Sequence, residues 1–334
     1  IGGVGFQPDF VWTKKRNGSN SHRLVDAVRG VTKTLSTDTA DAQATENTVT
    51  SFETDGFTVG AGNSNNDAGT YVAFNWDMGG SNATLTAGSI NSVVRASTTY
   101  GQSIVSYTGN AASSATIAHG LSSAPEMIIV RQLGANAWAV YHTSIGNTHL
   151  LELNTNAAKA DNDQFWNDTS PTSSVFTIGS HAEVNPNGVA VIAYAFHSVT
   201  GYSKFAGYTG TGASNAITTG FAPAFLIIKR ADGGTGGWMM YDSVRGASQQ
   251  VQAQVPDAED TVAGKISFQS TGFTCVIDHA ETNSDGDNYI YMAFADKREY
   301  AYWLDQSGNN NDWTSSNLTE SDISVDSPTN NFAT

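Results

Sequence analysis

The sequence contains a single cysteine and few charged residues. Charged side chains make up 14% of the chain, whereas roughly 25% is typical of soluble domains. One cysteine, Cys275, excludes an internal disulfide and a cysteine-based zinc site, and its apolar neighbours predict a buried side chain. No apolar run approaches the roughly 18 residues of a membrane-spanning helix. We therefore expect no membrane insertion.

Basic residues and catalytic motifs are also scarce. The chain has 16 Lys and Arg against 31 Asp and Glu, a formal net charge of −15. Such a surface repels phosphate backbones, so we expect no nucleic-acid partner. The sequence shows no nucleophile elbow, P-loop or dinucleotide-binding glycine motif, and none of its seven histidines forms a zinc-type pair. We expect no catalytic residues and no cofactor, and hence a protein that is not an enzyme.

Glycine and short apolar runs are plentiful, with 33 glycines in 334 residues. The runs "FLIIKR" (225–230) and "MIIVRQ" (127–132) are nearly continuous, as in strands buried on both faces. In contrast, "TVTSFETDGFTVG" (48–60) is closer to the alternation of a half-exposed strand. The best helical segment, within 155–168, predicts one or two turns at most. The sequence therefore predicts an all-β protein.

A unit of sequence recurs three times. The segment "GFAPAFLIIKR" from Gly220 matches "GLSSAPEMIIVR" from Gly120 and "GFQPDFVWTKK" from Gly5, and three further segments follow it in the same order in all three repeats. The period of about 100 residues exceeds the roughly 20–50 of solenoid repeats. We therefore predict three tandem antiparallel β-sandwich domains of jelly-roll or concanavalin type with an irregular tail. The predicted ranges are 1–80 (repeat one), 81–100 (connector), 101–198 (repeat two), 199–297 (repeat three) and 298–334 (polar C-terminal extension).

Repeat one lacks the opening strand of the other two. That strand is "SIVSYTGN" (103–110) in repeat two and "YSKFAGYTGTG" (202–212) in repeat three. We expect its counterpart to lie upstream of Ile1 or to come from another chain. The C-terminal extension is too polar to fold alone, although Trp303 and Trp313 would anchor it to a neighbour.

One turn motif is shared by all three repeats. It reads "VDAVRG" (25–30), "YHTSIG" (141–146) and "YDSVRG" (241–246), and only its final glycine is constant. A constant glycine indicates a strand end that turns on it. Asp26 with Arg29, and Asp242 with Arg245, would then be local ion pairs. The alternative is a ligand contact kept in repeats one and three only.

An acidic loop precedes the last strand of repeat three. Its carboxylates, Asp278, Glu281, Asp285 and Asp287, suggest a calcium site because hard cations favour oxygen ligands. The spacing does not match an EF-hand, however, and Asn-Gly and Asp-Gly clusters are typical of hairpin turns. We favour a hairpin, and the metal site remains undetermined with calcium as the alternative.

Aromatic residues also recur at fixed places. Trp138 and Trp238 occupy the same place in repeats two and three, and Trp12 lies on the preceding strand of repeat one. Tyr107 and Tyr208 repeat as well. Core packing is the favoured interpretation, and the alternative is an exposed platform on which sugar rings stack.

These segments together resemble a known family. The strings "GFQPDFVW", "DAVRG" and "SFETDGFTVG", the run from "SIVSYTGN" to "WAVYH", and the tail "YWLDQSGNNNDWT" are similar to a repeat of marine bacteriophage virion and tail-fibre proteins, often described as concanavalin A-like lectin/glucanase or as a domain of unknown function. The resemblance implies a β-sandwich and a place on the surface of the phage particle. It supplies no catalytic residues.

The resemblance leads to a functional expectation. It implies a tail fibre or capsid-surface appendage that forms a homotrimer, contacts other virion proteins and attaches multivalently to host surface carbohydrate. One alternative is a purely structural decoration protein that binds other virion proteins. The least favoured alternative is a glycan-degrading enzyme on the same fold.

Overall fold

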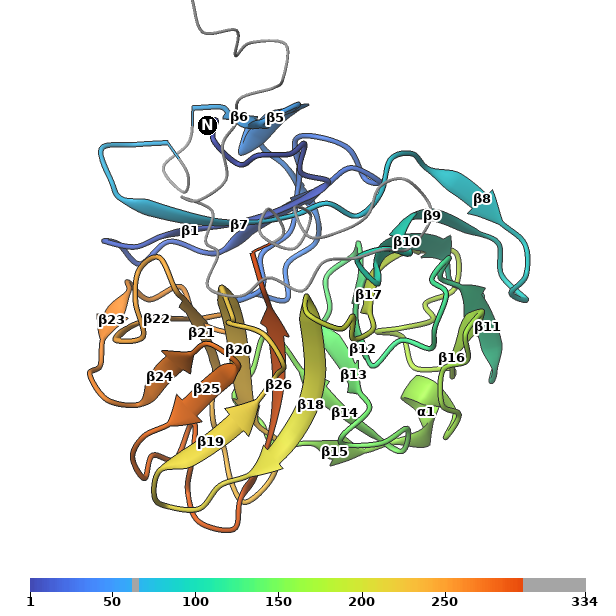
Figure 1. The fold of residues 1–334 in the computed structure, drawn as a ribbon. Helices are drawn as coiled ribbons and strands as arrows, with labels where there is room; N and C mark the ends of the chain where they lie inside the picture. Colours follow the sequence, from blue (N-terminus) through green and yellow to red (C-terminus); the bar gives the residue numbers. More distant parts are fainter. Residues whose placement is uncertain (62–65, 297–334) are drawn as a thin grey trace, which may run out of the picture.

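The computed structural model describes residues 1–61 and 66–296, and almost all of its regular structure is antiparallel β-sheet (Figure 1). The predicted all-β class is therefore confirmed. The predicted short helix is a single turn, α1 (Asp163–Trp166), capped by the Oδ1 atom of Asn162, which accepts a hydrogen bond from the N–H of Gln164. Within the described ranges, no helix is long and apolar enough to cross a membrane.

Repeat three contains two sheets. The six-stranded sheet has the order β18-β26-β20-β21-β22-β23, and the three-stranded sheet has the order β19-β25-β24. The bounds are β18 (Ser203–Thr209), β19 (Asn215–Thr218), β20 (Phe225–Arg230), β21 (Trp238–Asp242), β22 (Gln249–Gln252), β23 (Asp260–Thr261), β24 (Ile266–Gln269), β25 (Gly272–Cys275) and β26 (Asn288–Phe294). Cys275 is buried and free, as predicted.

Repeat two has the same plan with a wider large sheet. Its order is β15-β14-β13-β12-β17-β10-β9-β8, and β11 pairs with β16 in the smaller sheet. The segment predicted as a connector contributes β8 and β9. The bounds are β8 (Ala83–Leu85), β9 (Ser92–Ser97), β10 (Gln102–Thr108), β11 (Ala115–Ala118), β12 (Met127–Gln132), β13 (Ala139–His142), β14 (His149–Glu152), β15 (Ala160–Asp161), β16 (Val175–Ile178) and β17 (Ala190–Phe196).

Repeat one is reduced to a three-stranded sheet of order β2-β1-β7, with two small two-stranded ladders, β3-β4 and β5-β6. The bounds are β1 (Phe10–Lys15), β2 (Arg23–Asp26), β3 (Lys33–Thr34), β4 (Ala44–Thr45), β5 (Val49–Glu53), β6 (Gly56–Val59) and β7 (Tyr71–Trp76). β5 and β6 are partly exposed, as their sequence predicts.

The central strands keep one register in all three repeats. The first residue of β1, β12 or β20 lies opposite the last residue of β7, β17 or β26 on one side and opposite the turn motif on the other. The triplets are Trp76–Phe10–Asp26, Phe196–Met127–His142 and Phe294–Phe225–Asp242. Equivalent positions can therefore be assigned by strand pairing rather than by sequence similarity.

The continuous apolar runs are buried because each lies between two cores. In β20, Phe225 and Ile227 belong to a central cluster, whereas Leu226 and Ile228 belong to a smaller cluster between the two sheets of repeat three. The central cluster also includes Trp12 from repeat one and residues of repeat two. The three large sheets thus share one core, around which the repeats are arranged in Figure 1.

Equivalent side chains bind the repeats to one another. The indole Nε1 of Trp138 donates to the carbonyl of Ser36 (2.9 Å), so repeat two contacts repeat one. The indole Nε1 of Trp238 donates to the carbonyl of Glu152 (2.9 Å), so repeat three contacts repeat two. His22 occupies the same position in repeat one, where its Nε2 atom lies 3.0 Å from the carbonyl of a repeat-three residue.

The contacts of His22 fix its tautomer. The indole Nε1 of Trp12 donates to Nδ1 of His22 (2.9 Å), so Nδ1 is an acceptor and the ring proton lies on Nε2. Nε2 therefore donates to the carbonyl of Gln252 in repeat three. Burial lowers the pKa of His22 to about 3, so the ring is neutral. Repeat one thus contacts repeat three, and the three contacts form a closed ring.

A second set of contacts closes the ring in the opposite direction. Three equivalent backbone N–H groups each donate to an equivalent carbonyl in the next repeat, at 2.7–2.9 Å. The pairs are Gln43 to Leu133, Lys159 to Ala231 and Glu259 to Arg16. Every repeat therefore contacts both others through backbone hydrogen bonds as well as through the shared core.

Candidate functional site

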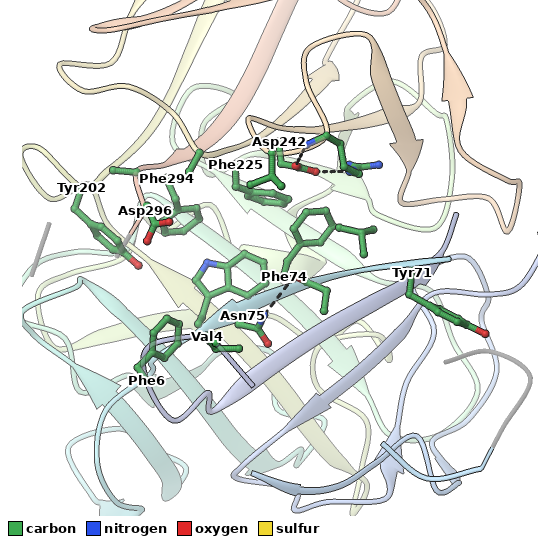
Figure 2. Close-up of a pocket in the computed structure, with 18 of the residues that line it drawn as sticks. Val4, Phe6, Tyr71, Phe74, Asn75, Tyr202, Phe225, Asp242, Phe294 and Asp296 are labelled. Carbon is green, nitrogen blue, oxygen red and sulfur yellow. Dashed lines mark hydrogen bonds and ion pairs between the residues drawn. The ribbon is translucent and has the colours of Figure 1, made fainter. Parts of the chain in front are cut away.

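A cleft of about 440 Å³ lies between repeats one and three (Figure 2). All of β7 lines it, together with Val4 and Phe6 from the N-terminal segment and residues from β20, β26 and the turn of repeat three. The cleft is thus formed where the ring of repeats passes from repeat three back to repeat one.

Within the described ranges, β7 differs from its counterparts in having an open edge at this cleft. β17 pairs with both β10 and β12, and β26 pairs with both β18 and β20. Among the described residues, β7 pairs with β1 alone. β17 and β26 are buried from their second residue onward, but in β7 only Phe74 and Trp76 are buried.

Aromatic rings form one wall of the cleft. The ring of Phe74 lies 4.5 Å from that of Phe225, centre to centre, and Trp76 lies 5.4 Å from Phe225 and 5.9 Å from Phe294. Figure 2 shows Phe74 from repeat one and Phe225 and Phe294 from repeat three pointing toward one another. Edge-to-face and tilted contacts of this kind stabilise the junction beyond the burial of their area.

The turn of repeat three forms the polar end of the cleft. Arg245 pairs with Asp242, as predicted, and with Glu259 (2.5 Å), which also binds Arg16 (2.7 Å). Burial opposes ionisation of Glu259, but the hydrogen bonds from both arginines lower its pKa below the usual value. The guanidinium carbon of Arg245 lies 5.8 Å from the centre of the Phe74 ring.

The same turn is enclosed in repeat one. Asp26 accepts hydrogen bonds from Arg29 (2.5 Å) and from the hydroxyl of Tyr194 in repeat two (2.8 Å). The predicted local ion pair is therefore confirmed, and it also forms part of the contact between repeats. In repeat two the equivalent of Asp26 is His142, and burial lowers its pKa to about 4.

The acidic loop of repeat three is not a hairpin, and that prediction was wrong. The loop joins β25, which pairs with β19 and β24, to β26, which lies in the other sheet. Its turn-forming residues serve a crossing between sheets, where the buried Asn283 donates to the carbonyls of Ala213 (2.5 Å) and Ile277 (3.1 Å). Asn185 makes equivalent contacts in repeat two.

Two of the four loop carboxylates are held by cations. Glu281 pairs with Lys265 (2.9 Å) and Asp287 with Arg230 (2.5 Å). Over residues 1–61 and 66–296, no three or more His, Cys, Asp or Glu side chains are grouped so that they would hold a metal ion. The calcium interpretation remains a prediction.

The recurring aromatic residues belong to the core, as favoured from the sequence. Trp138 and Trp238 are at most 1% exposed, and Tyr107 is also buried. The hydroxyls of Tyr107 and Tyr208 donate to the equivalent carbonyls of Val184 and Thr282, each at 2.6 Å. These rings support the crossings between sheets. The exposed-platform alternative does not apply to the buried Trp138, Trp238 and Tyr107, whereas Tyr208 is half-buried and packs against the core of repeat three.

A set of buried cations was not predicted. Lys14, Arg131 and Lys229 occupy one register position and are fully buried. Lys229 donates from Nζ to the carbonyls of Ala157 and Gly236, both at 2.7 Å. The signal was present, because each apolar run ends in a basic residue. The role of these cations could not be predicted, because the carbonyls that accept their hydrogen bonds lie in loops distant in the sequence.

The tail at 298–334, with Trp303 and Trp313, lies outside the described residues. Fold and cleft together define an all-β protein of three interlocked repeats. Comparison with curated proteins and with solved structures finds no match. The chain belongs to the family described as a domain of unknown function, DUF7483, which matches residues 1–298.

Proposed function

We propose that the protein is a non-enzymatic structural component of a bacteriophage particle, located on its surface as a tail fibre or capsid appendage. Each repeat would be a small antiparallel β-sandwich of jelly-roll or concanavalin type. The observation that carries this proposal is the interlocking of the repeats through equivalent contacts. A large apolar interface between units opposes relative motion, and the resulting rigid body suits a mechanical role.

The use of the polar residues supports a structural rather than a catalytic role. Asp26 and Arg29 are buried in a contact between repeats, and Asp242 and Arg245 are paired with each other. His22 is held neutral as a donor between repeats. Residue types that serve catalysis elsewhere therefore hold the ring together here.

Attachment to host carbohydrate is the proposed task of the assembled particle. Several copies of a weakly binding body, presented as a homotrimer, would raise the apparent affinity through effective concentration. Partners would be other copies of this chain and neighbouring virion proteins. The rival role is decoration, in which the body binds virion proteins only.

The test is solution mass followed by cell binding. Light scattering after size-exclusion chromatography should give a trimer, and fluorescently labelled trimer should remain on host cells and be displaced by soluble host glycans. A monomer that is not retained by cells would overturn the attachment role and favour decoration. Retention that soluble glycans do not displace would assign the receptor to another class.

One observation favours the enzymatic alternative and defines its test. Burial, followed by the nearby charge of Glu152, raises the pKa of Glu183 to about 7, a value suited to a general acid. If the protein cleaves glycans there, Glu183→Gln should abolish release of soluble sugars while the exposed control Glu53→Gln should not. We expect no release from either variant or from the unchanged chain.

A further inference from the structure

The turns of the repeats meet different surroundings at equivalent positions. In repeat two, Ser144 packs directly on β18, because a Cβ placed on Gly207 would lie 3.0 Å from the Cβ of Ser144. The equivalent residue in repeat three is Val244, which lines the cleft and is 93% exposed. Val244 thus faces the open edge of β7, where the counterpart of β18 would run.

Arg245, beside Val244, also lacks a contact on this side. Its Nη2 atom is buried and has no hydrogen-bond partner among the described residues. An unpaired donor on a buried guanidinium costs free energy, so a further acceptor beside this turn would stabilise the fold. An open strand edge, an exposed apolar side chain and an unsatisfied donor therefore coincide at one cleft.

The sequence after β26 matches the sequence that leads into β18. The chain reads "FHSVTGYSKFAGYTG" from Phe196, at the end of β17, and "FADKREYAYWLDQSG" from Phe294, at the end of β26. Without a gap, Tyr202 aligns with Tyr300, Phe205 with Trp303 and Gly210 with Gly308. In the first case the segment crosses from repeat two to supply the edge strand of repeat three.

We propose that residues 300–308 add to the open edge of β7 as an antiparallel strand and close the ring of repeats. Chain reach favours this occupant, because Asp296 already lines the cleft and Ala301 follows Phe294 at the same separation as Ser203 follows Phe196. Adding a strand to a free edge is an established mode of recognition.

The register of β18 on β26 defines the expected contacts. Phe205 lies opposite Met292 and Ala206 opposite Tyr291, so Trp303 is expected opposite Phe74 and Leu304 opposite Ala73. Phe205 also stacks on Phe196 at 5.6 Å, and Trp303 would complete the aromatic wall of the cleft in the same way.

Charge complementarity supports the same register. Asp305 aligns with Gly207, the residue that Ser144 contacts, and would therefore lie beside Val244 and Arg245. A carboxylate there would face a guanidinium with an unsatisfied donor, and Arg16 also lines this part of the cleft.

A disulfide in the full chain tests the register. Ala73→Cys combined with Leu304→Cys should form a bond within one molecule on mild oxidation, as detected by peptide mass spectrometry and by monomer mobility on a non-reducing gel. The matched control is Ala73→Cys with Leu318→Cys, which should not cross-link. Cys275 is fully buried and does not compete. A bond joining two molecules would overturn the proposal and assign the edge to a second copy.

Hydrogen exchange gives an independent measurement in the full chain. Trp303→Asp should speed exchange of the β7 amides by about tenfold or more, since the strand that protects them is lost. Trp313→Asp, the matched control beyond the segment, should leave them unchanged, and the amides of β17 report that each variant is folded. If Trp303→Asp has no effect while β7 remains protected, the edge is covered by another segment, such as one upstream of Ile1.

Discussion

The turn motif of repeat one and that of repeat three have the same ion pair and the same glycine but different surroundings. Gly30 and Gly246 have φ values of 90° and 91°, and Gly146 follows with 82°, so the left-handed conformation explains the constant residue. In repeat one the pair is covered by Tyr194 of repeat two. In repeat three it faces the cleft. Whether the ion pair of this motif is enclosed or faces a cleft is therefore decided by the next repeat in the ring.

The difference also shows how a repeat protein tolerates divergence. Position-equivalent residues need only perform the same physical task, and Trp138, Trp238 and His22 all donate to a carbonyl of another repeat. His22 is smaller than an indole, and Trp12 compensates by packing at its edge with ring centres 5.9 Å apart. The hydrogen bond to the neighbouring repeat is thus retained at the junction while the residue type changes.

Replacing the ring at the shared junction position should produce the largest effect. Trp238→Ala removes a fully buried indole and its hydrogen bond, and we expect a loss of about 3–5 kcal/mol in the free energy of unfolding. His22→Ala removes less volume but leaves Nε1 of Trp12 without an acceptor, and we expect a loss of about 1–3 kcal/mol in the free energy of unfolding. Urea unfolding of both variants measures this difference. Equal losses would contradict the expectation that the volume removed at this position sets the cost.

Breaking each ion pair should distinguish the turn of repeat one, which Tyr194 covers, from the turn of repeat three, which faces the cleft. Asp26→Asn leaves Arg29 without a carboxylate in a buried contact, which costs about 3 kcal/mol or more. Asp242→Asn should cost about 1–2 kcal/mol, because Arg245 retains Glu259. The midpoints of urea unfolding give the ranking. A larger loss for Asp242→Asn than for Asp26→Asn would contradict the compensation of Arg245 by Glu259.

Local features of the fold were predictable from the sequence, whereas contacts between repeats were not. The buried strands, the turn glycines and the Asp–Arg pairs follow from short-range patterns such as "FLIIKR" and "YDSVRG". The hairpin prediction failed because Asn and Gly clusters suit a crossing between sheets equally well. The cleft could not be predicted, since it depends on how β7 meets β26 across the ring.

Acid should destabilise repeats one and two through residues that repeat three lacks. Burial lowers the pKa of His22 to about 3 and of His142 to about 4, both below the usual 6.5. Below pH 6.5 the unfolded chain binds more protons, so stability falls by up to about 1.4 kcal/mol per pH unit for each histidine. His142→Asn should flatten the loss between pH 6.5 and 4, as measured by urea unfolding at each pH. An unchanged slope would contradict a neutral buried His142.

The smallest expected effect compares the buried lysines of repeats three and one near neutral pH. Burial lowers the pKa of Lys229 to about 7 and that of Lys14 to about 8, from the usual 10.5. Above its folded pKa each lysine is neutral in the native state, while the unfolded chain still holds the proton. Stability therefore rises with pH from about 7 for Lys229 and from about 8 for Lys14, by at most about 1.4 kcal/mol per unit.

Lys229→Met should remove the rise between pH 7 and 8, whereas Lys14→Met should leave that interval unchanged and flatten the curve above it. Urea unfolding at pH 7, 8 and 9 distinguishes the two. If Lys14→Met changed the lower interval instead, repeat one would hold the more strongly desolvated ammonium, and its junction would be the tighter of the two.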